Sequence, residues 1–454
     1  MPKRRVLCSN MIQVQQVGSR IPATRASNRL EIVRITNIRL DNFRNYQTAL
    51  MEPHSFGNII LGENAQGKSN LLEAIEFAGT GKAYRAAKDF ELVRHGADNM
   101  RLEINFEAEG MPESICIALK SKTGALHANA LTASLQRDIK VNGVKQSSTA
   151  ALKRRLIVVS FKSQDLNIVR GGPAFRRDWI DVLLGNLRAA TVGRLQQYQK
   201  IVAQRNRLLR TISESGRLTG SDREQLKTWD IQVAKSGSEI IKERLNLMSE
   251  LIPLAETHHE RLSGKREKLT SEYIFKSKSA RDGSYNFDED EDDSASLREM
   301  MKSFNIEDLK NAQTKDIAKI IYLMLKDIRG EEIARKQTLI GPHRDDIAFA
   351  LDGKSAMNFG SQGQQRSLVL SLKLAELEAV RNALNEQPVL LLDDVLAELD
   401  LLRQDVLMEM VGSGMQTFVT TTHLSSFKPE WLADSQFFNV ENGSLSAVRE
   451  PIPR

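Results

Sequence analysis

The stretch "GENAQGKS", residues 62–69, has the pattern G-x-x-x-x-G-K-S and decides the fold. It follows the apolar run "NIIL" (58–61) and precedes "NLLEAIEFA" (70–78), which has the apolar spacing of a helix. In a strand–loop–helix context, glycines let backbone amides approach phosphate oxygens, and the helix start adds unpaired N–H groups. The motif therefore predicts a nucleotide-phosphate site made of Gly62, Glu63, Asn64, Ala65, Gln66, Gly67, Lys68, Ser69 and Asn70.

A second apolar run, "PVLLLDD" (388–394), ends in two aspartates. A buried strand of this kind delivers carboxylates to the carboxyl edge of a sheet, where open α/β proteins bind ligands. We expect Asp393 to hold Mg²⁺ through a water molecule, together with the Ser69 hydroxyl, and Asp394 to orient an attacking water. The alternative is a strand end that carries two turn-forming acids.

Two more polar residues follow apolar strands. His423 ends "TFVTTTHL" (417–424) after a short loop with Asp400, and we expect it to sense the γ-phosphate, although a lone histidine there is more often structural. Gln164, just after "LIVVSF" (156–161), is an additional candidate Mg²⁺ ligand. The candidate catalytic residues are thus Lys68, Asp393, Asp394 and His423.

The distance between the two motifs predicts the organisation of the chain, because Asp393 lies 324 residues beyond Ser69. Between them, 82–165 alternates as β-strands do, whereas 175–210 and 226–262 have helical spacing and are expected to form two long antiparallel helices joined near 215–222. We predict an α/β ATPase head of the P-loop type, split in sequence by a mainly helical lobe. The expected parts are an extension (1–31), the first part of the head (32–185), the lobe (186–335) and the second part of the head (336–454).

The polar stretch "SQGQQRS" (361–367) leads into an apolar helix. Ser361 and Gln364 have capping-box spacing, which predicts a capped helix start with spare N–H groups and hence a second anion site. One chain cannot easily aim both helix starts at a single nucleotide, but a second copy can. We expect this segment to act on ATP bound by a partner subunit, through Ser361, Gln362, Gly363 and Gln364. An ordinary capped helix without a ligand is the alternative.

The chain has 454 residues, a net charge of +6 and a pI of about 9.1, which mildly favours a polyanionic partner. Residues 1–30 are basic, rich in hydroxyls and free of acids, as in an organellar transit peptide or a disordered basic tail. Residues 288–293 read "DEDEDD" within a segment, about 277–296, expected to be a disordered loop. The two cysteines offer no disulfide framework, and no apolar run is long enough to span a membrane.

No acid lies between Asp181 and Glu214, while several cations do. This run is either a solvated helix face or a stripe that contacts phosphates. The candidate DNA-binding residues are Arg188, Arg194, Lys200, Arg205 and Arg207, with 153–155.

The order of the motifs is that of ABC-type ATPases, and their sequences resemble those of the RecF family over about residues 33–440. The resemblance rests on six stretches: "NIRLDNFRNYQ" (37–47), "LGENAQGKSNLLEAI" (61–75), "DLNIVRGGPAFRRDWID" (165–181), "GPHRDD" (341–346), "SQGQQRSLVLSLKLAELE" (361–378) and "LLLDDVLAELD" (390–400). The chain departs from the usual bacterial pattern in its N-terminal extension and its acidic insertion.

The resemblance implies a DNA-repair ATPase, related to SMC and Rad50 heads, with ATP and Mg²⁺ as cofactors. It implies a homodimer formed with ATP, a weak DNA-stimulated hydrolysis that acts as a switch, and binding to single- and double-stranded DNA or gap junctions. It further implies roles in replication, recombination and the SOS response, with recombination mediator proteins and a recombinase as partners. The expected location is the nucleoid, in a bacterial cytoplasm or, given the extension, in a chloroplast or mitochondrion.

Three alternatives stay open. A transporter ATPase subunit would have its two motifs closer together and an LSGGQ-like loop. An SMC-like chromosome-structure head would need long coiled-coil arms, for which no sustained heptad repeat is present. A nucleotide-gated adaptor that docks on DNA without hydrolysing ATP would carry the same motifs.

Overall fold

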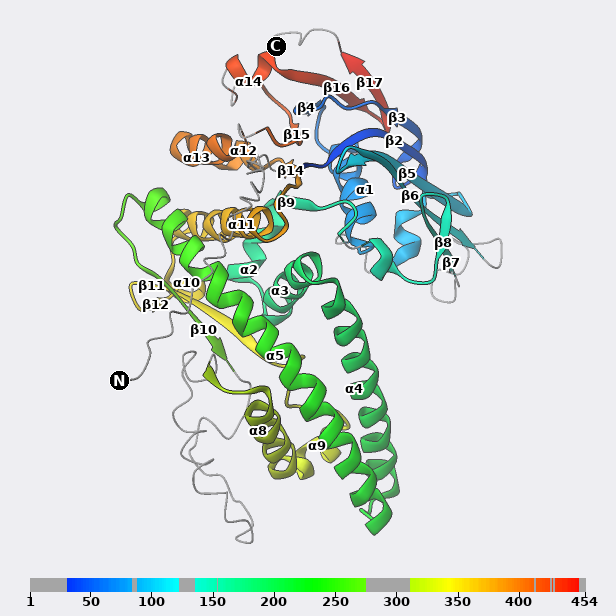
Figure 1. Ribbon diagram of the computed structural model, residues 1–454, viewed down its shortest axis with the longest axis vertical. Coiled ribbons are helices and arrows are strands. Elements are labelled where there is room, and N and C mark those ends of the chain that lie inside the picture. The colour runs from blue at the N-terminus through cyan, green and yellow to red at the C-terminus, as the bar shows by residue number, and fades with distance from the viewer. Residues whose placement is uncertain are drawn as a thin grey trace, which may run out of the picture.

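The computed structural model describes residues 31–83, 88–121, 135–152, 154–274, 311–411, 414–424, 427 and 429–448 (Figure 1). The basic extension up to residue 30, the acidic segment and position 153 lie outside these residues. Their interpretation as a transit peptide or tail, a solvated loop and a DNA contact therefore stays a prediction.

A mainly parallel sheet of six strands forms the centre of the head, in the order β17-β16-β4-β15-β14-β9, and only β17 is antiparallel to its neighbour. The four strands predicted from apolar runs are confirmed within two or three residues. Each run is continuous because a central strand is covered on both faces. The strands are β4 (Gly57–Leu61), β9 (Val158–Lys162), β14 (Val389–Asp393), β15 (Thr417–Thr421), β16 (Ser435–Glu441) and β17 (Ser444–Val448).

A second sheet of six strands is antiparallel and includes the alternating segments predicted as β, so those are confirmed. Helix α1 (Lys68–Thr80) lies between the two sheets, and its Leu71, Ile75 and Phe77 join one buried core with strands of both. Figure 1 shows this layering. The strands, in spatial order, are β3 (Tyr46–Met51), β2 (Arg34–Phe43), β5 (Asn99–Ala108), β6 (Met111–Ser121), β7 (Leu135–Val141) and β8 (Val144–Gln146).

The predicted pair of long antiparallel helices is confirmed as α4 (Ala189–Ser215) and α5 (Gly220–Ser263), which project away from the sheets in Figure 1. One part of the prediction was wrong, because 175–210 is not one helix. The backbone leaves the helical region at Arg188 (φ −136°, ψ 89°), which separates α4 from α3 (Pro173–Leu187). The apolar spacing continues across this break because each helix buries an apolar face, α3 against the head and α4 against the lobe.

The lobe does not close on itself. Strand β10 (Leu269–Ile274) pairs with β11 (Asp346–Leu351), which belongs to the second part of the head. Helix α5 packs along α11 (Gln362–Leu384), so one buried core runs through lobe and head. The remaining elements are β1 (Glu31–Ile32), η1 (Asp89–Leu92), η2 (Thr149–Leu152), η3 (Ser163–Leu166), α2 (Asn167–Arg170), α8 (Thr314–Asp327), α9 (Arg329–Arg335), β12 (Lys354–Ser355), α10 (Ala356–Phe359), β13 (Glu386–Gln387), α12 (Val395–Glu398), α13 (Leu401–Val411) and α14 (Pro429–Ala433).

The "GPHRDD" segment joins the lobe to the head. His343 shares a hydrogen bond of 2.7 Å with the Tyr198 hydroxyl of α4, and Asp346 accepts two hydrogen bonds from Arg176 of α3, at 2.7 and 3.0 Å. Burial lowers the pKa of His343 to about 4, so the ring stays neutral at neutral pH. The motif, which suggested no role from its residues alone, is therefore a partly buried polar junction.

Across the described ranges, no helix combines the length and the apolarity that crossing a bilayer requires.

Candidate nucleotide site

The phosphate loop lies between β4 and α1, as its motif requires. Gly62 has a φ of +154° and Gly67 a φ of +120°, and both glycines are tightly surrounded. A Cβ on Gly62 would lie 2.4 Å from the Val440 carbonyl oxygen, and one on Gly67 would lie 2.5 Å from Asn45 Nδ2. Only glycine fits at either position, which lets the loop pack closely against Val440 and Asn45.

Lys68 is the first residue of α1 and is only 4% exposed. Its Nζ donates hydrogen bonds to the carbonyls of Gly62, at 2.7 Å, and of Glu63, at 3.1 Å. The ammonium group therefore lies across the loop, beside the unpaired N–H groups of the helix start. Both features attract phosphate oxygens.

Ser69 and Asp393 meet at the carboxyl edge of the parallel sheet. Ser69 Oγ donates to Asp393 Oδ1 at 2.7 Å, and Thr420 Oγ1 donates to the same carboxylate oxygen at 2.9 Å. A hydroxyl and a carboxylate are the hard oxygen ligands that Mg²⁺ takes, with phosphate oxygens and water completing its shell. In the described part of the chain, no group of three or more His, Cys, Asp or Glu could hold a metal ion. Ser69 and Asp393 supply two such ligands, so they fit a cation whose shell a nucleotide completes.

The other predicted residues lie at the same edge. Asp394 begins α12 with a φ of +56°, and its backbone N–H donates to Thr420 Oγ1 at 2.9 Å. His423 is exposed two residues beyond β15, the strand between β4 and β14. Gln164 is exposed in η3, directly after β9 on the other side of β14. The fold thus brings the ends of three sequence-distant strands, β9, β14 and β15, to the sheet edge that carries the phosphate loop.

The predicted capping box at the start of α11 is confirmed. Ser361 N–H donates to Gln364 Oε1 at 2.7 Å, and the Gln364 N–H donates to Ser361 Oγ at 3.2 Å. Residues 361–363 are exposed. Gln364 Nε2 donates to Glu267 at 3.0 Å, and Arg403 donates to the Gly363 carbonyl at 3.2 Å. Glu267 and Arg403 lie on segments distant in sequence, and no motif around them indicates that they contact this helix start.

Four of the five predicted DNA-binding cations are exposed, on α4 or at its start. Arg188 lies 3.6 Å from Glu250, and Arg194 forms an ion pair with Glu243, both acids of α5. Lys200 and Arg207 are exposed further along α4.

Arg205 was predicted wrongly as a DNA contact. Its side chain is fully buried between Asp230 and Glu332, at 2.7 and 2.6 Å, and it also donates to Thr338 Oγ1 at 3.0 Å. A guanidinium enclosed in this way cannot reach a phosphate outside the protein, and it instead ties α4 to α5 and α9. The sequence shows that Arg205 carries a charge but not that two acids cover it.

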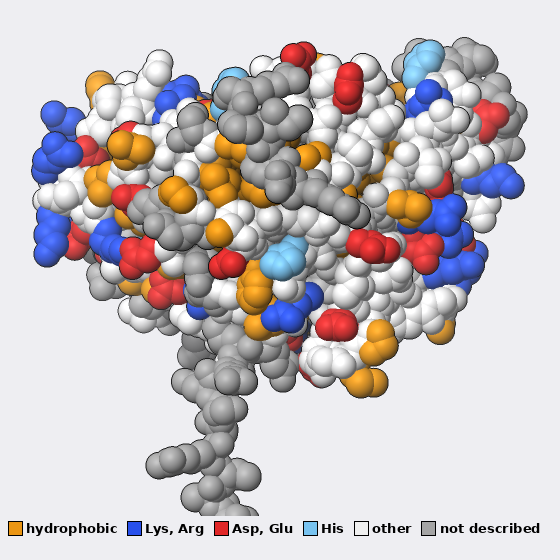
Figure 2. All heavy atoms as spheres, turned by 90° about the horizontal axis from the view of Figure 1, so that it is seen from above, with side chains coloured by type: hydrophobic (Ala, Val, Ile, Leu, Met, Phe, Trp, Pro, Cys, Tyr) orange, Lys and Arg blue, Asp and Glu red, His pale blue; other side chains and the backbone are white. Residues whose placement is uncertain are grey.

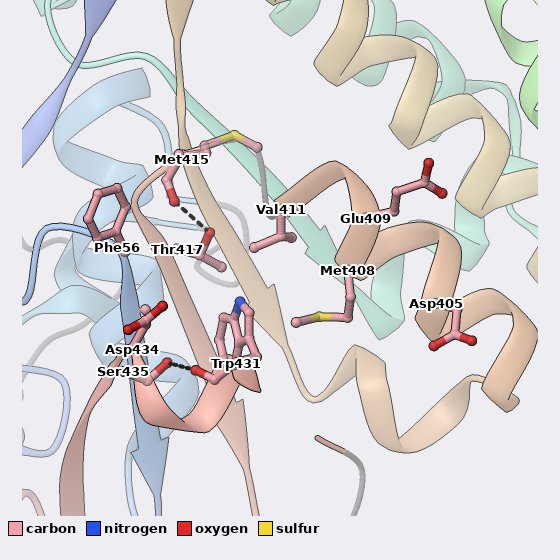
Figure 3. A pocket seen from close by; sticks show the side chains of 12 residues that line it. Phe56, Asp405, Met408, Glu409, Val411, Met415, Thr417, Trp431, Asp434 and Ser435 are labelled. Carbon is pink, nitrogen blue, oxygen red and sulfur yellow. Dashed lines mark hydrogen bonds between the residues drawn. The ribbon is translucent and has the colours of Figure 1, made fainter. Parts of the chain in front are cut away.

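A cavity of about 480 Å³ lies at the opposite edge of the parallel sheet, at the amino ends of β4, β15 and β16. Phe56, Met415 and Trp431 line it, with Asp434 beside them (Figure 3). Seen from the top of Figure 1, the molecule has hydrophobic side chains near the centre of this face and Lys and Arg in separate groups toward its sides (Figure 2). No residue of the phosphate loop lines this cavity, so it is not the nucleotide site.

A phosphate loop and an acid strand on one parallel sheet, with a capped helix start elsewhere on the head, define an ABC-type ATPase head. The family "RecF/RecN/SMC N terminal domain" matches residues 34–434. DNA replication and repair proteins RecF are 36% identical over 416 residues in Thermosynechococcus vestitus, covering 92% of this chain and 98% of that protein, and 38% identical over 417 residues in Microcystis aeruginosa, covering 90% and 99%. The chain belongs to the RecF family of DNA replication and repair proteins.

A solved structure agrees with this assignment. The structure of the recombination mediator protein RecF-ATPrS in the RecFOR pathway superposes with a TM-score of 0.75 at 28% identity, covering 93% of this chain and all of that one. The corresponding RecF-ATP structure has a TM-score of 0.73 at 29% identity, covering 92% and 98%. The first of these structures is of RecF with ATPrS and the second is of RecF with ATP.

Proposed function

We propose that this protein is an ATP-dependent DNA-binding protein of recombinational repair and replication restart, and that ATP closes two copies into a clamp on DNA. One observation carries the proposal: the Ser69 hydroxyl and the Asp393 carboxylate meet at 2.7 Å beside a phosphate loop that already holds its lysine in place. Each subunit binds Mg·ATP through Gly62–Ser69 and Asp393. Ser69 and Asp393 would hold Mg²⁺, which would neutralise charge on the phosphates.

The second half of the site comes from a partner copy. Ser361, Gln362, Gly363 and Gln364 form a capped, exposed helix start, which attracts an anion that its own chain holds elsewhere. Exposed apolar side chains lie on either side of this segment. Phe359 is 73% exposed just before it, and Leu401 and Leu402 are 79% and 54% exposed at the start of α13, whose Arg403 contacts Gly363. Such a surface fits contact with a second head.

Hydrolysis then opens the clamp. Asp394, with His423, orients water for in-line attack on the γ-phosphate, and loss of that phosphate removes the anion that joins the two heads. An aspartate reaches less far than the glutamate common in ABC proteins, so we expect turnover below about 1 s⁻¹, stimulated by DNA. This rate suits a switch that supports recombinase loading at gaps with recombination mediator proteins, as the RecFOR pathway of the solved relatives suggests.

The experiment that tests the proposal is analytical ultracentrifugation of the full chain at micromolar concentration. We expect a monomer alone and with ADP, a dimer with saturating Mg·ATP, and a dimer with bound DNA when a gapped duplex is added. A chain that binds ATP yet stays monomeric would contradict the clamp. A stable dimer that never releases phosphate would instead favour the nucleotide-gated adaptor.

The proposed DNA contact makes a separate prediction. Reversing two exposed charges of α4, Lys200→Glu with Arg207→Glu, should weaken DNA binding about tenfold for all sequences. The slope of log affinity against log salt concentration should fall by an amount that corresponds to about two fewer released ions. Fluorescence anisotropy with a labelled duplex at several salt concentrations measures both quantities. The matched control is Lys120→Glu with Lys140→Glu, two exposed lysines of the antiparallel sheet. Equal losses in both double variants would place the DNA face elsewhere.

A further inference from the structure

Two hairpin turns hold the phosphate loop from outside. The first is the turn between β2 and β3, within the segment "NFRNYQ". Asn45 Nδ2 donates to the Gln66 carbonyl at 2.7 Å, and the Tyr46 hydroxyl donates to the Gly67 carbonyl at 2.9 Å. Tyr46 is fully buried, and burial raises its pKa, so its hydroxyl stays a donor at any physiological pH.

This turn is itself firmly anchored. Arg44 has a φ of +53°, which is unusual for a non-glycine residue, and its guanidinium donates two hydrogen bonds of 2.9 Å to Glu73 of α1. Asn45 Oδ1 accepts a hydrogen bond of 2.9 Å from Asn70, also on α1. The turn is therefore hydrogen-bonded to α1 as well as to the phosphate loop.

The second turn, between β16 and β17, also contacts Gln66. The Gly443 N–H donates to the Gln66 carbonyl at 3.1 Å, and the Asn442 N–H donates to Gln66 Oε1 at 2.7 Å. A Cβ on Gly443 would lie 2.4 Å from the Asn45 carbonyl oxygen, so the two turns also touch each other. Both lone pairs of the Gln66 carbonyl are thus occupied, one from each turn.

These contacts determine where the amides of the loop point. A peptide unit is planar and trans, so the C=O of one residue and the N–H of the next point in opposite directions. Holding the Gln66 carbonyl against the two turns directs the Gly67 N–H away from them. The Gly67 carbonyl accepts from the Tyr46 hydroxyl and from the N–H groups of Asn70 and Leu71, which together fix the peptide unit that carries the Lys68 N–H. These are amides that a phosphate loop offers to its ligand.

We propose that Asn45 and Tyr46 are positioning residues for ATP, because they hold the Gln66 and Gly67 carbonyls so that the amides of Gly67 and Lys68 face the phosphates before ATP arrives. The inference rests on the proposed function. It also gives the antiparallel sheet a role at the nucleotide site, because its β2–β3 hairpin carries both residues. A loop already in its binding geometry loses less conformational entropy when the ligand binds.

The test compares two variants that each remove one buried hydroxyl. Tyr46→Phe removes the hydroxyl donor to the Gly67 carbonyl, which keeps its bonds from the N–H groups of Asn70 and Leu71. Tyr198→Phe removes a hydroxyl that bonds His343 at 2.7 Å far from the loop. Both should lower the melting temperature by a few degrees. Only Tyr46→Phe should weaken binding of a fluorescent ATP analogue, by about tenfold, measured well below either melting temperature.

Asn45→Ala and Asn45→Asp provide a second comparison if Tyr46→Phe folds poorly. Aspartate cannot donate to the Gln66 carbonyl and adds a negative charge near the phosphates, so Asn45→Asp should bind ATP more weakly than Asn45→Ala. If the Tyr46 and Asn45 variants bind ATP as the unmodified chain does, the positioning role is wrong although ATP binding stands. If the unmodified chain binds no ATP, the proposed function itself fails.

Discussion

Lys68→Ala is expected to weaken ATP binding by roughly a thousandfold, about 4 kcal/mol, because the change removes a nearly buried ammonium group from the phosphate loop. In this position the charge is screened little by water, and its Coulomb attraction for the outer phosphates is correspondingly strong. Titration with a fluorescent ATP analogue measures the affinity. Lys68→Arg should be almost as damaging, because the planar guanidinium does not fit a space where the lysine is 4% exposed.

The control for this variant is Lys82→Ala. Lys82 lies just after α1 on the same head, is 46% exposed and pairs with Asp178 at 2.5 Å. Removing it changes the net charge by the same amount, so a loss of affinity in Lys68→Ala alone isolates the local effect. An affinity of Lys68→Ala within threefold of the unmodified chain would mean that the loop does not hold the nucleotide.

Ser361→Arg should leave ATP affinity unchanged and abolish the ATP-driven dimer. The long cationic side chain would occupy the exposed start of α11, where we propose that the γ-phosphate of the partner's ATP approaches. The change also removes the capping bond to Gln364, at a cost of about 1 kcal/mol of stability. Ultracentrifugation with saturating Mg·ATP, beside the same titration used for Lys68→Ala, separates the two effects.

Thr219→Arg is the matched control. Thr219 begins α5 with the same kind of capping box, formed with Asp222, and is exposed at the lobe tip. It therefore loses an equivalent cap and gains an equivalent charge far from the proposed interface. We expect Thr219→Arg to dimerise normally. If both variants lose the dimer, loss of the cap or of stability explains the result and the signature has no role in trans.

Mixing the two damaged chains gives the sharpest distinction between action within a chain and action across chains. A pair of one Lys68→Ala chain and one Ser361→Arg chain has one composite site with an intact loop and an intact signature. We expect partial recovery of the ATP-driven dimer in the mixture, although neither variant dimerises alone. No recovery would indicate that each loop works with the signature of its own chain.

The core of the site could be predicted because its chemistry depends on short local patterns. The loop between 62 and 69, the strand before Asp393 and the capping box of Ser361 each follow from neighbouring residues, and the apolar runs beside them identify the buried strands. Helical spacing predicted α4 and α5 for the same reason. It did not predict the break at Arg188, because apolar residues keep the same helical spacing before and after this residue.

The sequence by itself determined the phosphate loop, the acid strand, the capped helix and their order, since each is a local pattern with one structural reading. Only the tertiary structure decided what each charge and carbonyl meets. It buried Arg205 between two acids and set Asn45, Tyr46 and Gly443 around the carbonyls of Gln66 and Gly67. These partners lie on segments distant in sequence. A sequence shows which residues can form hydrogen bonds, but only the packing of the chain determines which of them are buried next to each other.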